Sequence, residues 1–370
     1  MNNRERFMTA LKLGQPDRIP YTDTWFNEES ILKVGKYFVS DLPPMKYFFD
    51  CSPEEVFRFY DVQMKVVKEL DLDAITVGYS TRTQRVVGEK DAIKDCYGIV
   101  YRVTEHGEPF PVAGPLNDAN DLKRFKATRP THADFGLLQY VREKMPERVV
   151  MVSLPDPFKF CWSLLGAMER LLVCYVTDSE FCLELTRIAT DFLKEVIEMS
   201  IDEKAEIILL EGDLAYNSDT LMSPDHYRKF IKPYQHALCE VAHKKGVPII
   251  KHTDGNAWSI LDDLVEVGFD GIHPVQPQCM EIKKVKEHLK GKCCVLGNID
   301  CSFLLPFGTE EEVIENVKDT IRRAAPGGGY ILTSSNSIHP GCKGENVISM
   351  FRTAMECGSY PIKIDEFCYQ

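Results

Sequence analysis

The chain has 370 residues, of which 44% are hydrophobic, so it can bury a large core in one barrel-sized domain or two smaller ones. A formal net charge of −12 and the absence of a basic stripe argue against a nucleic-acid partner. No apolar run reaches the roughly 20 residues that span a bilayer, and the start lacks the apolar stretch of a secretory signal, so we expect a cytoplasmic protein outside the membrane.

Short β-branched runs alternate along the chain with segments of helical periodicity. Capping boxes at Ser52 and Thr309 each begin a predicted helix. An alternating segment at residues 97–104 is predicted as an excursion hairpin outside the main series. The predicted buried strands cover residues 18–23, 73–78, 149–154, 207–213, 247–252, 270–274, 293–300 and 330–333.

Alternation of strands and helices implies parallel strands joined by helical crossovers. The count reaches eight, and no linker rich in Gly, Ser or Pro divides the chain. We therefore predict an α/β fold, a (β/α)8 TIM barrel with an N-terminal helical extension, as a single domain over residues 1–370. A doubly wound open sheet is the alternative, because two of the strands are weakly marked.

The 13 cysteines are odd in number and show no CxxC motif or repeated spacing. In a chain of this length they indicate reduced thiols, most of them buried as small hydrophobic side chains. A ligand or a reactive thiol must therefore be identified from its context.

Catalytic groups of such barrels lie at the C-terminal ends of the strands. His252 and Asp254 are two residues apart where the fifth strand ends, so both project to the same side, and Lys251 projects to the other. This alternation argues against Lys251 as a Schiff-base lysine. The polar residues at the strand ends are Asp23, Glu211, Asp213, His252, Asp254, His273, Asn298, Asp300, Asn336, His339 and Cys342.

Imidazole, thiol and carboxylate groups together form a zinc ligand set. Three protein ligands and an open fourth position make such an ion a Lewis acid. Each group also has an ordinary structural interpretation, as a hydrogen-bonded His–Asp pair, a buried thiol or an ion-paired glutamate. No phosphate-binding glycine loop follows a strand, and no GxSxG motif occurs, so nucleotide binding and serine hydrolysis are not supported.

An ordered set of motifs resembles the uroporphyrinogen decarboxylase superfamily over nearly the whole chain. The resemblance implies the same (β/α)8 barrel. The motifs are Pro16-Asp-Arg-Ile-Pro20, Leu221-Met-Ser-Pro-Asp-His-Tyr-Arg-Lys-Phe-Ile-Lys-Pro-Tyr234, His252-Thr-Asp-Gly-Asn256, Gly271-Ile-His-Pro-Val-Gln-Pro277, Gly297-Asn-Ile-Asp300 and Gly327-Gly-Gly-Tyr-Ile-Leu332.

The decarboxylases of this superfamily carry an Arg-Gln-Ala-Gly-Arg segment after the first strand, which binds substrate carboxylates. Residues 22–29 of this chain contain no arginine and several acids, which would repel a tetrapyrrole with eight carboxylates. The decarboxylases' early catalytic aspartate has no clear match in residues 76–80. A decarboxylase is therefore kept only as an alternative.

The other branch comprises corrinoid-dependent methyltransferases, whose zinc ligands are a His-x-Cys after the fifth strand and a Cys in a Pro-Gly-Cys context after the eighth. This chain has His252-x-Asp254 and Pro340-Gly-Cys342. The resemblance therefore implies zinc held by His252, Cys342 and a carboxylate, either Asp254 or Glu211. A carboxylate in place of a thiolate hardens the site, which favours a methoxy (O-methyl) donor over a thiol.

We expect methyl transfer between a small methoxy compound and a corrinoid (methylcobalamin type) carried by a partner protein, as in an O-demethylase. Asp213, Asn298 and His339 are the predicted catalytic residues, which orient the donor or protonate the leaving oxygen.

Predicted substrate contacts are Asp23, His273 and Asn336. The alternatives are a decarboxylase, a methylcobalamin:thiol methyltransferase and a non-catalytic corrinoid-binding module. A homodimer is compatible with the helix patterns.

Overall fold

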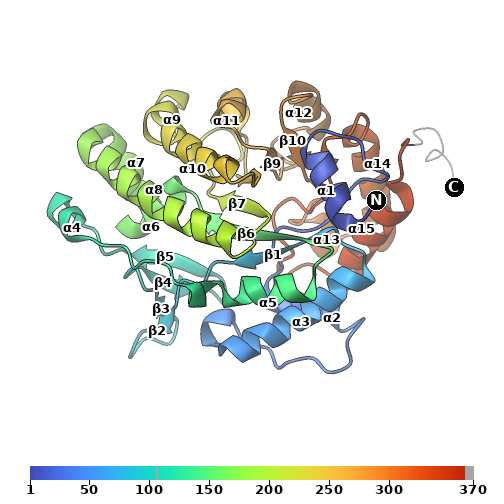
Figure 1. Ribbon diagram of the computed structural model, residues 1–370, viewed down its shortest axis with the longest axis horizontal. Helices are drawn as coiled ribbons and strands as arrows, with labels where there is room; N and C mark the ends of the chain where they lie inside the picture. Colours follow the sequence, from blue (N-terminus) through green and yellow to red (C-terminus); the bar gives the residue numbers. More distant parts are fainter. Residues whose placement is uncertain (106, 363–370) are drawn as a thin grey trace.

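Seven parallel strands form a curled sheet at the centre of the computed structural model, which describes residues 1–105 and 107–362 (Figure 1). Each strand pairs with the next one in this series, as expected for successive β–α–β crossovers. In order, they are β1 (Ala74–Gly78), β6 (Val149–Pro155), β7 (Ile207–Glu211), β8 (Ile249–His252), β9 (Gly271–His273), β10 (Cys294–Leu296) and β11 (Tyr330–Ile331).

The extended segment around Tyr21 occupies the eighth position and joins the two edges of this sheet. Thr22 N donates to Leu332 O at 3.1 Å and Leu332 N donates to Pro20 O at 3.0 Å, just after β11. On the other side, Asp73 N donates to Tyr21 O at 3.0 Å, just before β1. The predicted barrel is thereby confirmed, with its first strand reduced to a few backbone hydrogen bonds.

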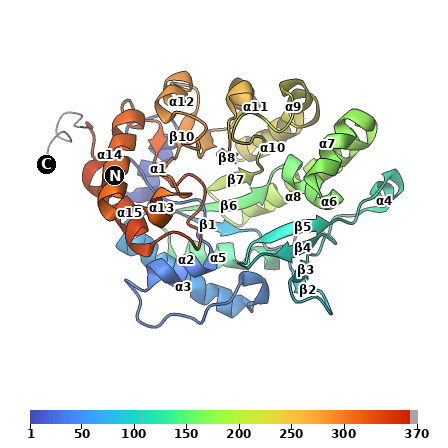
Figure 2. The ribbon, with the colours of Figure 1, turned by 180° about the vertical axis from the view of Figure 1, so that it is seen from behind.

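Helices surround the barrel on its outer side (Figures 1 and 2). Ser52 and Thr309 form the predicted capping boxes, at the starts of α3 and α14. The helices are α1 (Asn3–Leu11), α2 (Glu28–Gly35), α3 (Pro53–Glu69), α4 (Ala119–Arg124), α5 (Gly136–Lys144), α6 (Pro157–Leu165), α7 (Met168–Thr177), α8 (Ser179–Asp202), α9 (Pro224–Phe230), α10 (Lys232–Lys244), α11 (Leu261–Val267), α12 (Ile282–His288), α13 (Leu304–Phe307), α14 (Glu310–Ala324) and α15 (Gly344–Cys357), with short 3-10 turns at Phe48–Asp50, His132–Phe135 and Trp258–Ile260.

A small four-stranded antiparallel sheet is inserted between β1 and β6 and confirms the predicted excursion (Figure 1). Its strands are β2 (Gln84–Arg85), β3 (Ala92–Lys94), β4 (Val100–Val103) and β5 (Pro109–Ala113). Residues of β4 and β5 line a cavity together with Glu211, which ends β7, so this sheet forms a wall beside the carboxyl ends of the barrel strands.

Alternation along the strands separates two cores. Val149 and Met151 of β6 face the barrel interior, and Val150 and Val152 pack outward against the helices. Phe7 of α1 belongs to the interior cluster, so α1 closes the N-terminal end of the barrel. The carboxyl ends of the strands are left as the open mouth.

Among the described residues, no single helix has the length and apolar character needed to cross a membrane. One sharply bent pair, α6 with α7 at 98°, passes that test by length and composition.

The buried carboxylate of Asp73 links the N-terminal segment, which includes α1 and Tyr21, to the barrel. Asp73 is 0% exposed and accepts from Arg6 at 2.8 Å, from Arg18 at 2.9 Å and from the backbone N of Tyr21 at 2.9 Å. It therefore joins α1, the barrel-closing segment and the start of β1.

Asp73→Ala leaves two partly buried guanidinium groups without this carboxylate. We expect a loss of about 3–5 kcal/mol in the free energy of unfolding, measured by urea denaturation. The control is Asp202→Ala, which removes an exposed ion pair with Lys245 and costs less than about 1 kcal/mol. Equal losses in the two variants would contradict this role for Asp73.

Candidate metal centre

Three side chains converge at the mouth of the barrel. His252 is the last residue of β8, and Asp213 and Asp254 each lie two residues beyond a strand end. One ligand atom from each of the three lies within 4.8 Å of the others. His252 Nε2 is 3.6 Å from Asp213 Oδ1 and 3.7 Å from Asp254 Oδ1.

Sheet register explains why these groups meet. Glu211 of β7 pairs with His252, which in turn pairs with His273 of β9. Ile250 belongs to the interior cluster, so by alternation His252 also faces the barrel axis. The loop after β8 then turns at Gly255, whose φ of +84° favours glycine.

The two carboxylates of this cluster lie close together. The backbone N of Asp254 donates to Asp213 Oδ1 at 3.0 Å, and Asn336 donates to Asp254 Oδ2 at 2.5 Å. Asp254 Oδ1 is buried and has no hydrogen-bond partner among the described residues. Burial, with repulsion from Asp213, raises the pKa of Asp254 to about 6.

Asp213 behaves differently. Burial alone would raise its pKa, but the charge of His252 and the hydrogen bond from the Asp254 backbone hold the pKa below its ordinary value. Its side chain is 49% exposed, so the cluster is open to the mouth.

The donor set fits a divalent ion. A tetrahedral zinc ion with ligand bonds of 2.0–2.1 Å places its ligand atoms about 3.3 Å apart, close to the separations found here. Three protein ligands leave the fourth position open, as in catalytic zinc sites. The buried, unpartnered Asp254 Oδ1 is the atom that such an ion would satisfy.

His273 lies directly behind His252. The two Nδ1 atoms are 2.7 Å apart, and the His273 side chain is fully buried. Burial lowers the pKa of His273 well below its ordinary value, so the ring is neutral. The structure therefore places this predicted substrate residue against the other histidine rather than in the open mouth.

Glu211, predicted as an alternative ligand, lies outside the cluster. It accepts from Ser153 Oγ at 2.5 Å, and Lys159 Nζ lies 3.4 Å from its other oxygen. Sequence reasoning missed both partners. The Asp156-Pro157 pair after the third predicted strand is a helix-start signal that could have drawn attention to Lys159.

Cys342, predicted as the thiolate ligand, is not part of the described cluster around His252. Its buried thiol lies 4.0 Å from the carbonyl of Cys301, and His339 Nε2 lies 2.7 Å from the same carbonyl. Burial, with the neighbouring Cys301, raises the pKa of the Cys342 thiol to about 12. The structure thus groups Cys342 with Cys301 and His339.

The remaining predicted residues are spread around the mouth. Asp23 is buried and accepts from Ser334 N at 3.0 Å, and burial raises its pKa to about 7. Asn298 donates to Val275 O at 2.7 Å. Of the predicted catalytic and substrate residues, Asp213 is a member of the cluster, and Asn336 and His273 contact it.

Lys251 projects to the opposite face of β8 from His252, as expected from alternation. Its fully buried ammonium donates to Asp156 Oδ2 at 2.8 Å and to Gly212 O at 2.6 Å. Asp156 also caps α6 by accepting from Lys159 N at 2.8 Å. This buried ion pair fixes the loop that carries Asp213.

A cavity of about 590 Å³ opens beside the cluster and is lined in part by Glu211 and Asp213. Lys159 is the only cationic residue among the described residues that line it. The apolar walls are largely aromatic. They include Tyr97, Tyr101, Phe110, Phe160, Trp162 and Phe192.

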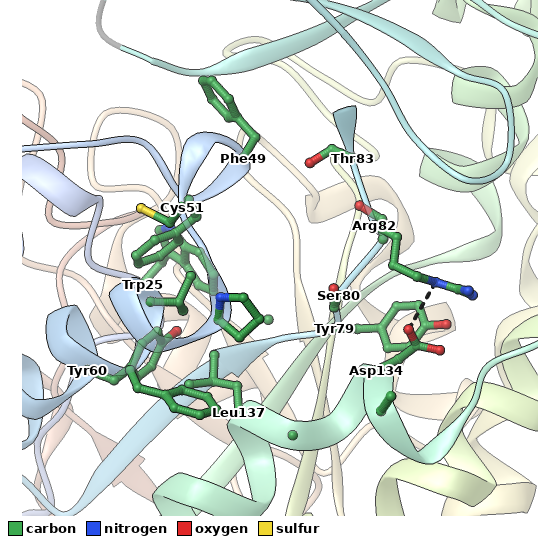
Figure 3. Close-up of a pocket in the computed structure, with 18 residues that line it drawn as sticks. Trp25, Phe49, Cys51, Tyr60, Tyr79, Ser80, Arg82, Thr83, Asp134 and Leu137 are labelled. Atoms are coloured by element: carbon green, nitrogen blue, oxygen red, sulfur yellow. Dashed lines mark ion pairs between the residues drawn. The ribbon is translucent and has the colours of Figure 1, made fainter. Parts of the chain in front are cut away.

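A second pocket, of about 380 Å³, adjoins this cavity and shares Gly78, Tyr79 and Thr81 with it. Figure 3 shows Trp25 and Tyr60 on one side of this pocket, facing Tyr79 on the other. Arg82 pairs with Asp134 at 3.0 Å at its edge (Figure 3). The mouth is thus extended by an aromatic groove along the loop after β1.

Comparisons with known proteins agree with this architecture. The family model described as uroporphyrinogen decarboxylase (URO-D) matches residues 58–357. Curated relatives include a uroporphyrinogen decarboxylase from Synechocystis sp., 27% identical over 162 residues, which are 43% of each chain. Another is a methylcobamide:CoM methyltransferase from Methanosarcina acetivorans, 22% identical over 219 residues, 58% of this chain and 62% of the relative.

These matched segments cover less than two thirds of either relative's own length. Among solved structures, a methyltransferase from Methanosarcina mazei superposes with a TM-score of 0.71 at 20% identity, covering 96% of this chain and 99% of the other. The likeness establishes a shared fold over nearly the whole chain.

The geometry yields a prediction about the ligands. His252→Ala removes one of three ligand atoms, and Asp213→Asn replaces an anionic carboxylate ligand with a weaker neutral amide oxygen, so the purified variants are expected to lose most of their bound zinc. Cys342→Ser is expected to keep the zinc content of the unchanged protein, because its thiol lies apart from the cluster. Elemental analysis by mass spectrometry measures this. Loss of zinc in Cys342→Ser, with retention in Asp213→Asn, would contradict the assignment.

Proposed function

The chain belongs to the uroporphyrinogen decarboxylase family, and we propose that it is a zinc-dependent methyltransferase. In this proposal a methoxy compound donates its methyl group to a corrinoid carried by a partner protein. The observation that carries the proposal is the Asp213–His252–Asp254 cluster, with its open side and its unpartnered Asp254 oxygen. Methylcobamide-dependent activity in a curated relative supports the corrinoid partner.

The ligand atoms support an oxygen substrate. One imidazole nitrogen and two carboxylate oxygens form a harder set than one containing thiolate, which leaves more positive charge on the ion. Such an ion polarises an ether oxygen better than it activates a thiol. A methoxy donor is therefore favoured over a thiol substrate.

The cavity beside the cluster supports an aromatic donor. Its volume of about 590 Å³ is in the range of small-molecule sites, and far exceeds what methanol needs. Tyr97, Phe160 and Phe192 contact one another there, with ring centroids 5.2–5.4 Å apart. Such walls suit a flat ring whose methoxy group reaches Asp213.

The same cavity is unsuited to a polycarboxylate. Asp95, Glu108, Glu211 and Asp213 line it, and Lys159 is the one cation among its described lining residues. A tetrapyrrole with many carboxylates would meet a like-charged surface. This charge balance supports methyl transfer over tetrapyrrole decarboxylation.

A zinc ion in this cluster supplies Lewis acidity toward the ether oxygen, and a reduced corrinoid supplies the nucleophile that accepts the methyl group. When the C–O bond breaks, the oxygen keeps the electron pair. Lys159 faces the same cavity, so its ammonium is placed to stabilise that developing charge and to donate a proton. Glu211 pairs with the Lys159 ammonium at 3.4 Å, and Ser153 in turn donates a hydrogen bond to Glu211.

The function is tested by incubating the purified protein with methoxyphenols or methoxybenzoates and reduced free cobalamin. Formation of methylcobalamin, followed by its absorbance, is expected from zinc-loaded protein and is expected to stop after chelator treatment and to return with zinc. Methyl transfer that survives complete metal removal would contradict the proposal. So would release of CO2 from a tetrapyrrole together with no methyl transfer.

Lys159→Met should lower kcat by about 100-fold while changing KM little, because the lost group acts on the leaving oxygen. Lys159→Arg should recover part of that rate. Lys194→Met on α8, which removes only a surface partner of Asp191, is the control. Steady-state kinetics with one methoxy substrate measure the effect, and an unchanged kcat in Lys159→Met would rule this role out.

A further inference from the structure

Two imidazoles face each other at the ends of neighbouring strands. His252 and His273 are paired in the register of β8 and β9, and their Nδ1 atoms are 2.7 Å apart. A contact this short between two ring nitrogens requires one to donate and the other to accept. One proton therefore lies between the two Nδ1 atoms.

The state of the other ring nitrogen of His252, Nε2, determines which of the two rings carries that proton. His252 Nε2 faces Asp213 and Asp254 at 3.6 and 3.7 Å, too far for hydrogen bonds. A ring nitrogen that binds a cation cannot carry a proton. With a cation at Nε2, His252 must be protonated at Nδ1, and His273 Nδ1 must be the acceptor.

With His273 Nδ1 as the acceptor, the His273 proton lies on Nε2, a buried atom with no hydrogen-bond partner among the described residues. The side chain of His273 is 0% exposed, so neither water nor substrate reaches the ring. Its backbone carbonyl accepts from Thr253 N at 3.0 Å, and Thr253 Oγ1 accepts from Leu214 N at 2.8 Å. These bonds join His273 to the residues that follow His252 and Asp213, so the acceptor and the ligands form one unit.

We propose that His273 is a positioning residue of the metal centre, which accepts the His252 Nδ1 proton and thereby presents His252 Nε2 to the cation. This inference rests on the proposed zinc site and identifies the residue that holds its imidazole in the binding tautomer. An acceptor on the second nitrogen of a histidine ligand fixes the ring orientation and raises its basicity. His273 is thus assigned the role of orienting the His252 ring and not that of contacting the substrate.

Two substitutions separate the acceptor role from simple packing. In His273→Asn, the Oδ1 atom is separated from Cα by the same number of bonds as Nδ1, so it can accept the same proton. His273→Leu fills the space and offers no acceptor. His288→Leu replaces a surface histidine bonded to Asp262 and is the control.

The readout is the zinc dissociation constant of each full-length variant, measured by competition with a chromophoric chelator. His273→Leu is expected to bind zinc more weakly than the unchanged protein by about 10–100-fold. This is on the order of the loss in metal affinity seen when a hydrogen-bond partner of a histidine ligand is replaced. His273→Asn and His288→Leu are expected to stay within about threefold. Tight binding by His273→Leu, or equal weakening in Leu and Asn, overturns the proposal and leaves the zinc site standing.

A second measurement needs no variant. Nitrogen NMR of the zinc-loaded protein, labelled with 15N-histidine, is expected to show His252 protonated at Nδ1 and His273 protonated at Nε2. A proton on Nδ1 of His273 overturns the proposal even when zinc is bound. Absence of zinc binding by the unchanged protein instead overturns the proposed function, on which this inference rests.

Discussion

Repulsion between two carboxylates, Asp213 and Asp254, is the constraint on which the mouth of this barrel depends. The two acids are held together by a backbone hydrogen bond, and they face an imidazole nitrogen too distant to donate to either. One of the four carboxylate oxygens is buried without a partner among the described residues. A divalent cation resolves all three features at once, since it neutralises the acids and binds the nitrogen.

Several other features of the fold keep Asp213, His252 and Asp254 in these positions. Register between β7, β8 and β9 brings the strand ends to one level, and α1 closes the opposite end. Asp73 fixes the first segment to β1, and the buried Lys251–Asp156 pair fixes the loop that carries Asp213. The packed barrel therefore fixes the two loops that hold these acids close together.

Much of the fold was predictable from the sequence because the signals are local. β-Branched runs marked the strands, and the capping boxes at Ser52 and Thr309 begin helices as expected. His252 and Asp254 were paired correctly by period-two alternation. The place of the first strand in the ring could not be predicted locally, since it depends on hydrogen bonds to Leu332 and Asp73, far away in sequence.

The site was harder to predict because its remaining members depend on register and on loop paths. Asp213 was assigned to catalysis, since nothing in the sequence gives its distance to His252. His273 lies behind His252 only because β8 and β9 pair at those two residues. Cys342 follows the last strand in a loop, where alternation gives no direction, and its family motif carries no information about the neighbouring Cys301.

One cation is proposed to join Asp213, His252 and Asp254. The most direct measurement is anomalous diffraction from crystals of the zinc-loaded protein, recorded on both sides of the zinc absorption edge. We expect an anomalous peak within bonding distance of His252 Nε2 and of one oxygen from each aspartate. A peak at the thiol of Cys342, or none beside His252, would contradict this proposal.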